Sequence, residues 1–310
     1  MSALICGSFA YDHIMVFPDR FKNHILPEKV HILNVSFMVP EMRREFGGCA
    51  GNIAYNLNLL GGAALPMGTV GKDFDPYAYW LDKNRINRRH VKVIDEAYTA
   101  QAFITTDLDD NQITAFHPGA MSFAHHNHIA DAKGVTLGIV SPDGRDGMLQ
   151  HAAQYTEAGI PFIFDPGQGM PMFNALELLA FIEKSSWITV NDYEWQLLQE
   201  RTGLAPHQVA ERVKALIITR GGNGSVIYTS TKRYDIPVVN TAKVEDPTGC
   251  GDAYRAGLLF GLMNDMDWDT TGRIASLMGA IKIAHPGTQN HTFEPQEFRD
   301  RFTQEFGYTY

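Results

Sequence analysis

The chain has 310 residues, of which 45% are hydrophobic and 20% charged, and its formal net charge is −9. This composition supports a sizeable folded core and does not suit a disordered chain. No clustered basic run is present, which argues against a nucleic acid as partner. An acidic chain can still bind an anionic nucleotide, but only locally, through backbone amides and a cation.

Two further features of the sequence bear on location and redox chemistry. No apolar run reaches about 18 residues and the N-terminus has no signal-peptide pattern, so we expect a cytoplasmic protein that does not enter a membrane. The three cysteines are far apart and odd in number, which predicts free, mostly buried thiols at Cys6, Cys49 and Cys250. Without a CxxC pair, a cysteine zinc site is not expected.

The first third of the chain mixes strands with one clearly bounded helix. Apolar and alternating runs predict strands, and helical spacing of Ile53, Leu57 and Leu60 predicts a helix that Gly61 and Gly62 close. The predicted strands are residues 4–7, 9–16, 32–39 and 63–70, and the predicted helices are residues 49–60 and 77–81.

Residues 102–106 and 113–116 are two β-rich runs on either side of the turn Asp109-Asp110-Asn111, which predicts a β-hairpin. A calcium loop is the alternative for the acidic turn. It is disfavoured because the glycine and the distal glutamate of such a loop are missing.

Beyond residue 135 strands and helices alternate regularly. The pattern predicts βαβ units, and therefore a three-layer α/β/α fold with a mostly parallel central sheet. Two segments, about 10–46 and 95–120, do not fit the alternation, and we expect them to form a small β-sheet lid inserted in a single domain of residues 1–310. The alternating strands are residues 136–140, 161–164, 187–190, 215–219 and 225–228, and the helices are residues 148–157, 173–183, 193–201, 206–212, 251–263, 268–285 and 294–306.

The most informative segment for chemistry is residues 245–257. Gly249 and Gly251 permit close backbone approach, and the helix that follows directs free N–H groups at the same point. Such a loop can form an anion hole for a phosphoryl group, and Asp252 beside it can accept a proton from a hydroxyl. The alternative is an ordinary acidic residue in the first turn of a helix.

Three more segments have glycine or acidic patterns at the ends of predicted elements. Residues 46–52 place three glycines and Asn52 before a helix, and residues 218–225 form a glycine-rich loop between strands. In residues 190–194, Asn191 and Glu194 follow a strand, where ligand sites of α/β folds gather, and Glu194 could hold a hydrated Mg²⁺. Simple turns and a helix cap are the alternatives.

Together, the four segments resemble the signatures of the ribokinase-like family of sugar and nucleoside kinases, also called the PfkB family. The first signature is matched by Gly47 to Ala54 with Gly61 and Gly71, and the second by Asp246 to Asp252 with Ala256 and Gly257. Asn191 to Glu194 match the NxxE element and Thr219 to Gly224 the nucleotide loop. The resemblance covers nearly the whole chain.

This resemblance implies a ribokinase-like fold and a set of roles. Asp12, Gly48 and Asn52 would bind the substrate, Asp252 would be the base, and the backbone of Gly249, Cys250 and Gly251 would form the anion hole. MgATP would bind at Thr219, Arg220, Gly221, Gly222 and Gly224. Asp246, Thr248 and the turn 284–288 resemble the part that holds a monovalent cation, often K⁺. Cys250 and Ala10 depart from the residues common at their positions, and Ala10 weakens an interpretation as a ribokinase proper.

Residues 49–57, 115–121 and 164–168 resemble prokaryotic nucleoside kinases within the family, which implies the 5′-hydroxyl of a purine nucleoside such as adenosine, inosine or guanosine as acceptor. Phe103 could stack on the base, or else pack the core of the lid. Gln168 could reach the nucleotide phosphates, or else be a turn residue.

Two other functions stay open at this point. A kinase for a free sugar or a sugar phosphate would need cations near the acceptor, and Arg43 and Arg44 are the candidates. A nucleoside-binding sensor without activity would not need Asp252. The sequence leaves monomer and homodimer open, and residues 125–128 (His-His-Asn-His) are expected to be a solvated connector in preference to a metal site.

Overall fold

A large sheet forms the centre of the computed structural model, which describes residues 2–25, 32, 34–109 and 111–310. Its nine strands lie in the order β13-β12-β11-β10-β9-β8-β1-β4-β5. Neighbouring strands are parallel except for the pairs β11–β12 and β12–β13, which are antiparallel. The strands are β1 (Ser2–Cys6), β4 (Ala63–Gly71), β5 (His90–Ile94), β8 (Leu137–Val140), β9 (Phe162–Phe164), β10 (Trp187–Asn191), β11 (Ala215–Thr219), β12 (Ser225–Tyr228) and β13 (Arg233–Ile236).

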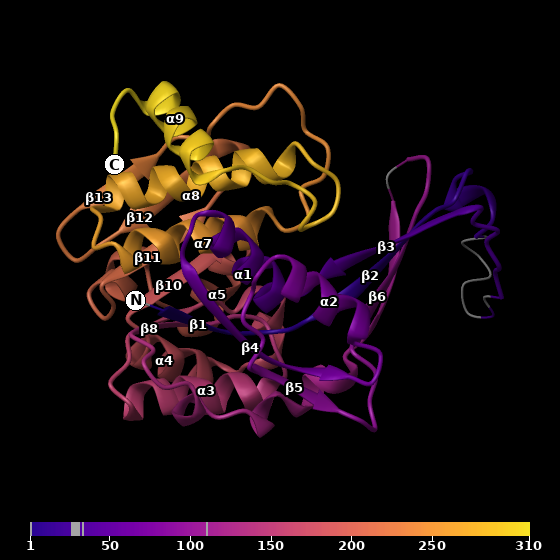
Figure 1. Ribbon diagram of the computed structural model, residues 1–310, viewed down its shortest axis with the longest axis horizontal. Helices are drawn as coiled ribbons and strands as arrows, with labels where there is room; N and C mark the ends of the chain where they lie inside the picture. The colour runs from indigo at the N-terminus through magenta and orange to yellow at the C-terminus, as the bar shows by residue number, and fades with distance from the viewer. Residues whose placement is uncertain (1, 26–31, 33, 110) are drawn as a thin grey trace.

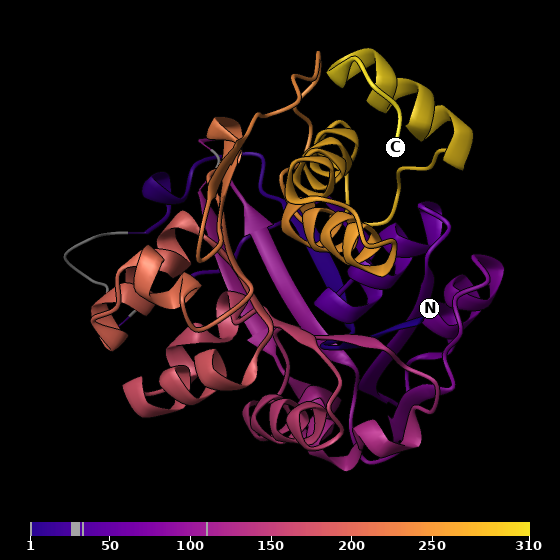
Figure 2. The ribbon, with the colours of Figure 1, turned by 90° about the vertical axis from the view of Figure 1, so that its left-hand side faces the viewer.

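Helices cover both faces of this sheet and give three layers (Figure 2). One layer packs on the face that includes Ala3 and Ile5 of β1, and contains α1 (Cys49–Leu59), α2 (Asp75–Lys83), α7 (Cys250–Met263) and α8 (Trp268–Ile283). The other packs on the face of Leu4 and Cys6, and contains α3 (Arg145–Glu157), α4 (Ala175–Lys184), α5 (Asp192–Thr202) and α6 (Pro206–Ala210). Helix α9 (Pro295–Phe306) packs outside α8. Successive residues of β1 point to opposite faces of the sheet and all are hydrophobic, so both faces of the sheet must be covered by helices.

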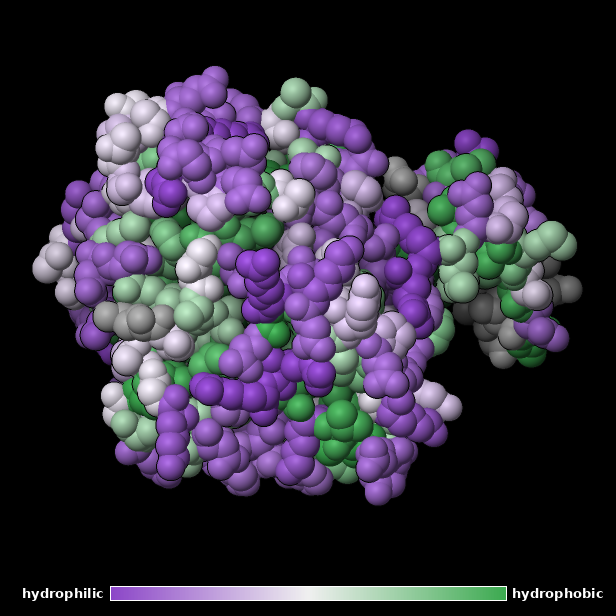
Figure 3. Space-filling view, in the orientation of Figure 1, coloured by the Kyte–Doolittle hydropathy of each residue, from purple (hydrophilic) through white to green (hydrophobic). Residues whose placement is uncertain are grey.

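A second, four-stranded sheet projects from the large one (Figure 1). Its order is β3-β2-β6-β7, with β2 (Ala10–Val16), β3 (Glu41–Gly47), β6 (Ala100–Thr106) and β7 (Gln112–His117). Strand β7 is exposed along its whole length, and Figure 3 shows hydrophobic side chains on the surface of this projection. The small sheet therefore has little cover on either face from the described parts of the chain.

The predicted fold class is confirmed, and most predicted elements are present with ends shifted by a few residues. The hairpin of residues 102–106 and 113–116 is confirmed as β6 and β7, although Asp110 in its turn lies outside the described residues. The strand predicted at residues 32–39 is wrong. Residues 34–39 are irregular, residue 33 is not described, and the strand that pairs with β2 begins at Glu41.

The packing of α7 against α8 fixes the helix that carries Asp252. A Cβ atom on Gly257 would lie 2.5 Å from the Cα atom of Ala275 in α8, and one on Gly261 would lie 2.4 Å from the Thr271 hydroxyl. The two helix backbones can approach this closely only because glycine has no side chain.

We therefore expect Gly257→Ala to lower the free energy of unfolding by about 1–3 kcal/mol, because a new methyl group cannot fit without moving a helix. Urea denaturation measures this loss. Gly279→Ala in α8 is the matched control, since its Cβ would meet only the Cys250 carbonyl at 3.9 Å. Equal stability of the Gly257 variant and the wild type would contradict the packing argument.

Candidate active site

Asp252 lies in the first turn of α7, next to a tight turn that glycine makes possible. Gly249 precedes the helix with φ 78°, in the left-handed region that favours glycine. The Cys250 amide donates to the Pro247 carbonyl at 3.2 Å, whereas the amides of Gly249 and Gly251 have no partner among the described residues. These two amides are free to bind an anion at the helix N-terminus. The Cys250 amide, also predicted to line the anion hole, is engaged within the turn in this structure.

The Asp252 carboxylate is hydrogen-bonded to Asn52, the last residue of the glycine-rich segment 46–52. The Asn52 side chain in α1 donates from Nδ2 to Asp252 Oδ2 at 2.8 Å. Burial raises the pKa of Asp252 to about 6, and the hydrogen bond from Asn52 and the charge of Arg255 oppose this rise. The carboxyl group is thus ionised at neutral pH and remains basic enough to accept a proton.

A chain of hydrogen bonds fixes the orientation of the Asn52 amide. Trp80 Nε1, which can only donate, binds Gln289 Oε1 at 2.8 Å, so the amide nitrogen of Gln289 must point the other way. That nitrogen donates to Asn52 Oδ1 at 2.9 Å and to the Tyr77 hydroxyl at 2.7 Å. Asn52 must then present its own NH₂ group to Asp252. Gln289 could not be found from the sequence, because it lies in an irregular segment 237 residues from Asn52.

Asp12 lies at the base of the small sheet, and both its carboxylate and that of Asp252 are close enough to Tyr77 to influence its hydroxyl. Strand β2 pairs with β3 so that Ala10 faces Gly47 and Asp12 faces Glu45. Burial, followed by the charges of Glu45 and Asp246, raises the pKa of Asp12 to about 6. Gly48 has φ 86° and packs directly on the backbone of residues 8–10. The predicted substrate residues Asp12, Gly48 and Asn52 thus come from adjoining segments.

The register of the small sheet separates Phe103 from Asp12. In β6, Ala102 pairs with Asp12 of β2 and with Phe116 of β7, so these three residues share one face. Phe103 is on the opposite face, where its ring stacks on His13 with 4.7 Å between ring centroids. The prediction that Phe103 contacts a base bound beside Asp12 does not fit this register. Phe116, half-exposed on the face of Asp12, is the aromatic residue that does.

The residues predicted to bind ATP lie at or after the ends of three neighbouring strands, β9, β10 and β11. Asn191 ends β10 and pairs with Thr219 at the end of β11. The loop after β11 has positive φ at Gly221 (52°) and Gly224 (74°), and its first residue, Arg220, donates its amide to the Gly224 carbonyl at 2.8 Å. Gly222 lies exposed in the same loop, and Gln168 is exposed in the segment after β9. The loop and Asn191 thus share one end of the sheet.

Glu194 has a structural role at the N-terminus of α5. Its two carboxylate oxygens accept from the amide and from Nδ2 of Asn191, at 2.8 and 2.9 Å, which caps the helix. Burial raises the pKa of Glu194, and nearby Arg255 opposes the rise. Each oxygen keeps one lone-pair direction, so the carboxylate can still accept hydrogen bonds from water around a Mg²⁺ ion.

Arg255 and Asp165 form a buried ion pair that no sequence pattern indicated. Asp165 follows β9 and receives two hydrogen bonds from the guanidinium, at 2.8 and 2.9 Å. The same guanidinium lies 3.9 Å from Glu194 and donates to the Gly251 carbonyl at 3.3 Å. It therefore connects the first turn of α7 with the ends of two strands.

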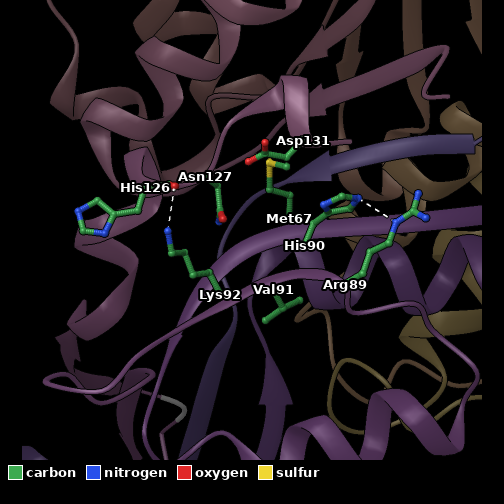
Figure 4. Close-up of a pocket in the computed structure, with 8 residues that line it drawn as sticks. All are labelled: Met67, Arg89, His90, Val91, Lys92, His126, Asn127 and Asp131. Atoms are coloured by element: carbon green, nitrogen blue, oxygen red, sulfur yellow. Dashed lines mark hydrogen bonds between the residues drawn. The ribbon is translucent and has the colours of Figure 1, made fainter. Parts of the chain in front are cut away.

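Two hollows elsewhere on the surface share none of these motif residues. One, of about 330 Å³, lies beside Phe103 and is lined by Tyr98, Gln101, Phe103 and His117. The other, of about 240 Å³, lies at β5, where Arg89 donates to His90 and Lys92 donates to the His126 carbonyl (Figure 4).

No group of three or more His, Cys, Asp or Glu side chains suited to a metal ion occurs in the described residues, those around His125 included. None of the described helices has the length and hydrophobicity needed to cross a membrane.

Comparisons with known proteins define the class of protein. The family model described as pfkB family carbohydrate kinase matches residues 9–295. Ribokinase from Thermotoga maritima superposes with a TM-score of 0.78 at 17% identity, which shows the shared fold. The chain therefore belongs to the pfkB family, and it is a phosphotransferase with a hydroxyl group as acceptor.

Nearer relatives are nucleoside kinases. The structure of Burkholderia thailandensis nucleoside kinase in complex with inosine is 54% identical, covers 99% of both chains and has a TM-score of 0.91. A nucleoside kinase from Methanocaldococcus jannaschii is 32% identical over 266 residues, which are 85% of this chain and 87% of the relative. The predicted resemblance to this branch of the family is confirmed.

The geometry predicts a pH dependence that Gln289 controls. Activity should rise with pH through about 6, because Asp252 must lose its proton before it can accept another. Gln289→Met should move this acidic limb of kcat/KM upward by about 0.5–1 pH unit. Without Gln289 the Asn52 amide is free to rotate, and it then no longer donates the hydrogen bond that stabilises the Asp252 carboxylate.

The measurement is the pH profile of kcat/KM for both proteins. Gln150→Met is the control, since Gln150 also donates hydrogen bonds from its side-chain amide, here to the carbonyls of His125 and Asn127, but lies outside the site. An unshifted limb in the Gln289 variant would show that Gln289 does not orient Asn52.

Proposed function

We propose that the protein is an ATP-dependent nucleoside kinase that phosphorylates the 5′-hydroxyl of a purine nucleoside, inosine among them. The observation that carries this proposal is the pairing of Asp252 with Asn52 beside the two free amides of Gly249 and Gly251. Support for the acceptor comes from the 55% identity to the Burkholderia thailandensis enzyme in complex with ADP and inosine.

In this proposal the nucleoside lies between the main sheet and the small sheet. Asp12 accepts hydrogen bonds from the ribose hydroxyls, and Gly48 and Asn52 contact the ribose edge. Phe116 stacks on the base. The small sheet acts as a lid of the single domain, and its closure excludes water that would otherwise hydrolyse ATP.

The reaction itself needs one proton transfer and stabilisation of charge. Asp252 accepts the proton of the 5′-hydroxyl while that oxygen attacks the γ-phosphoryl group in line. The amides of Gly249 and Gly251 bind the oxygens on which charge develops. The loop from Thr219 to Gly224, together with Asn191 and Gln168, holds ATP. Mg²⁺ bound with the nucleotide would neutralise charge on the phosphates, and Glu194 would hold its water shell.

A sugar-phosphate kinase is the second candidate, and the arginine positions argue against it. Arg43 lies 3.8 Å from Asp246 and 3.7 Å from Glu45, so carboxylates already surround it. Arg44 lies over the Tyr11 ring on the opposite face of the small sheet. Arg44 thus lies on the face away from Asp12, and Arg43, on the face of Asp12, already lies beside two carboxylates. A sensor without activity is not supported, because the chain belongs to an enzyme family and keeps the proposed base.

The test of the function is phosphate transfer from MgATP to adenosine, inosine, guanosine, cytidine, ribose, fructose and fructose 6-phosphate. We expect transfer to purine nucleosides and a loss of about two orders of magnitude or more in Asp252→Asn, because the amide cannot accept the proton. Transfer to sugars alone would overturn the acceptor. Near-wild-type turnover in the variant would overturn the base.

The assignment of the base contact has its own matched pair of variants. Phe116→Ala should raise KM for inosine about fivefold to tenfold with a smaller effect on kcat, because stacking on the base is lost. Phe103→Ala removes an equal ring from the other face of the same strand pair and should leave KM unchanged. The reverse result would place the base in the hollow beside Phe103.

A further inference from the structure

A buried ammonium group lies at the C-terminal end of α8. Lys282 is in the last turn of that helix, and its side chain has no solvent exposure. Its Nζ atom donates to the Asp246 carbonyl at 2.7 Å and to the His285 carbonyl at 3.1 Å. A fully buried lysine is rare unless its charge is paired, so these contacts require an explanation.

The two carbonyls belong to the segments that the family resemblance relates to a monovalent cation. Asp246 begins the turn that leads to Gly249, and its carboxylate joins the second segment by accepting from the Gly287 amide at 2.9 Å. Lys282 Nζ lies between the same two segments and within hydrogen-bond distance of a carbonyl from each. A potassium ion bound to those oxygens would need the space that the ammonium fills. The expectation that Asp246 and Thr248 hold K⁺ therefore does not fit this chain.

We propose that Lys282 supplies a built-in positive charge at this junction, so that the enzyme positions its anion hole without a monovalent cation. The ammonium holds the Asp246 carbonyl, and Asp246 Oδ1 accepts from the Thr248 amide at 2.9 Å, one residue before Gly249. The amides of Glu245 and Asp246 both donate to the Ile283 carbonyl, at 2.8 and 3.2 Å. Lys282 is thus a positioning residue that acts through the turn on α7.

The surroundings suit a positive charge. The C-terminal end of a helix favours cations, and Lys282 lies in the last turn of α8. Burial, and to a smaller extent the charge of Arg43, lowers the pKa of Lys282, whereas the carboxylates of Asp246 and Glu45 act in the opposite direction. Arg43 is another cation near this junction, but it is half-exposed, and its ion pairs within the described residues are with the carboxylates of Glu45 and Asp246.

The test compares three variants in buffer without K⁺, Na⁺ or NH₄⁺ and in the same buffer with added KCl or NH₄Cl. Lys282→Ala leaves a space that an ion can fill, whereas Lys282→Met fills that space with an apolar chain. Lys243→Ala is the control. Lys243 comes shortly before the turn that begins at Asp246, and its side chain forms an exposed ion pair with Glu245. Phosphate transfer to inosine and the thermal unfolding midpoint are both measured.

We expect the wild type and the Lys243 variant to change by less than about twofold in kcat/KM on addition of K⁺. Lys282→Ala should lose about tenfold or more without the ions and regain most of it with K⁺ or NH₄⁺, because a bound ion replaces the ammonium. Its unfolding midpoint should rise with K⁺ concentration by mass action. Lys282→Met should lose activity and show no rescue.

Two outcomes would overturn the proposal: activation or thermal stabilisation of the wild type by K⁺, or a Lys282→Ala variant that equals the wild type without ions. If Lys282→Ala folds poorly, its folded yield with and without KCl answers the same question, and equal yields count against the proposal. The activity arm rests on the proposed function. The unfolding arm does not, so a wrong acceptor and a wrong role for Lys282 give different results.

Discussion

The hydrogen bond between Asn52 and Asp252 joins two residues 200 positions apart, and the candidate site depends on it. Each residue lies in the first turns of a helix that begins after glycines, α1 for Asn52 and α7 for Asp252. Because both helices pack on the same face of the central sheet, their N-termini converge at one point. Free amides, a carboxylate and an amide side chain are thereby combined in a place that no single segment could form.

The small sheet determines which side chains face the candidate site. Its two faces differ in chemistry, with Asp12 and Phe116 on one and Phe103 and His13 on the other. A shift of one residue in the register of β2 and β6 would exchange the faces and turn Asp12 away from Asp246. The pairing of Ala10 with Gly47 at the base of the sheet therefore matters as much for binding as the residues that would contact the substrate.

The sequence allowed prediction of the elements whose signal is local. Alternating or apolar runs bounded by glycine predicted most strands of the large sheet, and glycine-rich turns before helices predicted where the site lies. Strands β5 and β13 were missed because they lie at the sheet edges and each buries only one residue, so neither has a clear apolar pattern. Residues 34–39 looked like a strand but have no partner strand in the structure, which no local pattern could show.

Contacts that depend on strand register, or on packing between distant segments, could not be predicted from the sequence. The face on which Phe103 lies follows from the pairing of β2 with β6, and not from alternation within β6 alone. Lys282 and Arg255 are charged residues of a type that usually lies at the surface, yet both are almost fully buried. Their partners come from loops 36 and 90 residues away, so only the assembled fold shows why charge is tolerated there.

The ion pair of Arg255 and Asp165 also restricts how this family of sequences can change. Loss of either partner alone leaves an unpaired charge away from water, which costs several kcal/mol, whereas replacement of both by apolar residues can be nearly neutral. A lineage that leaves this pair must therefore pass through a poorly stable intermediate or change both codons together. We expect the two positions to vary jointly among homologues, as a single inherited unit that spans the turn after β9 and the first turns of α7.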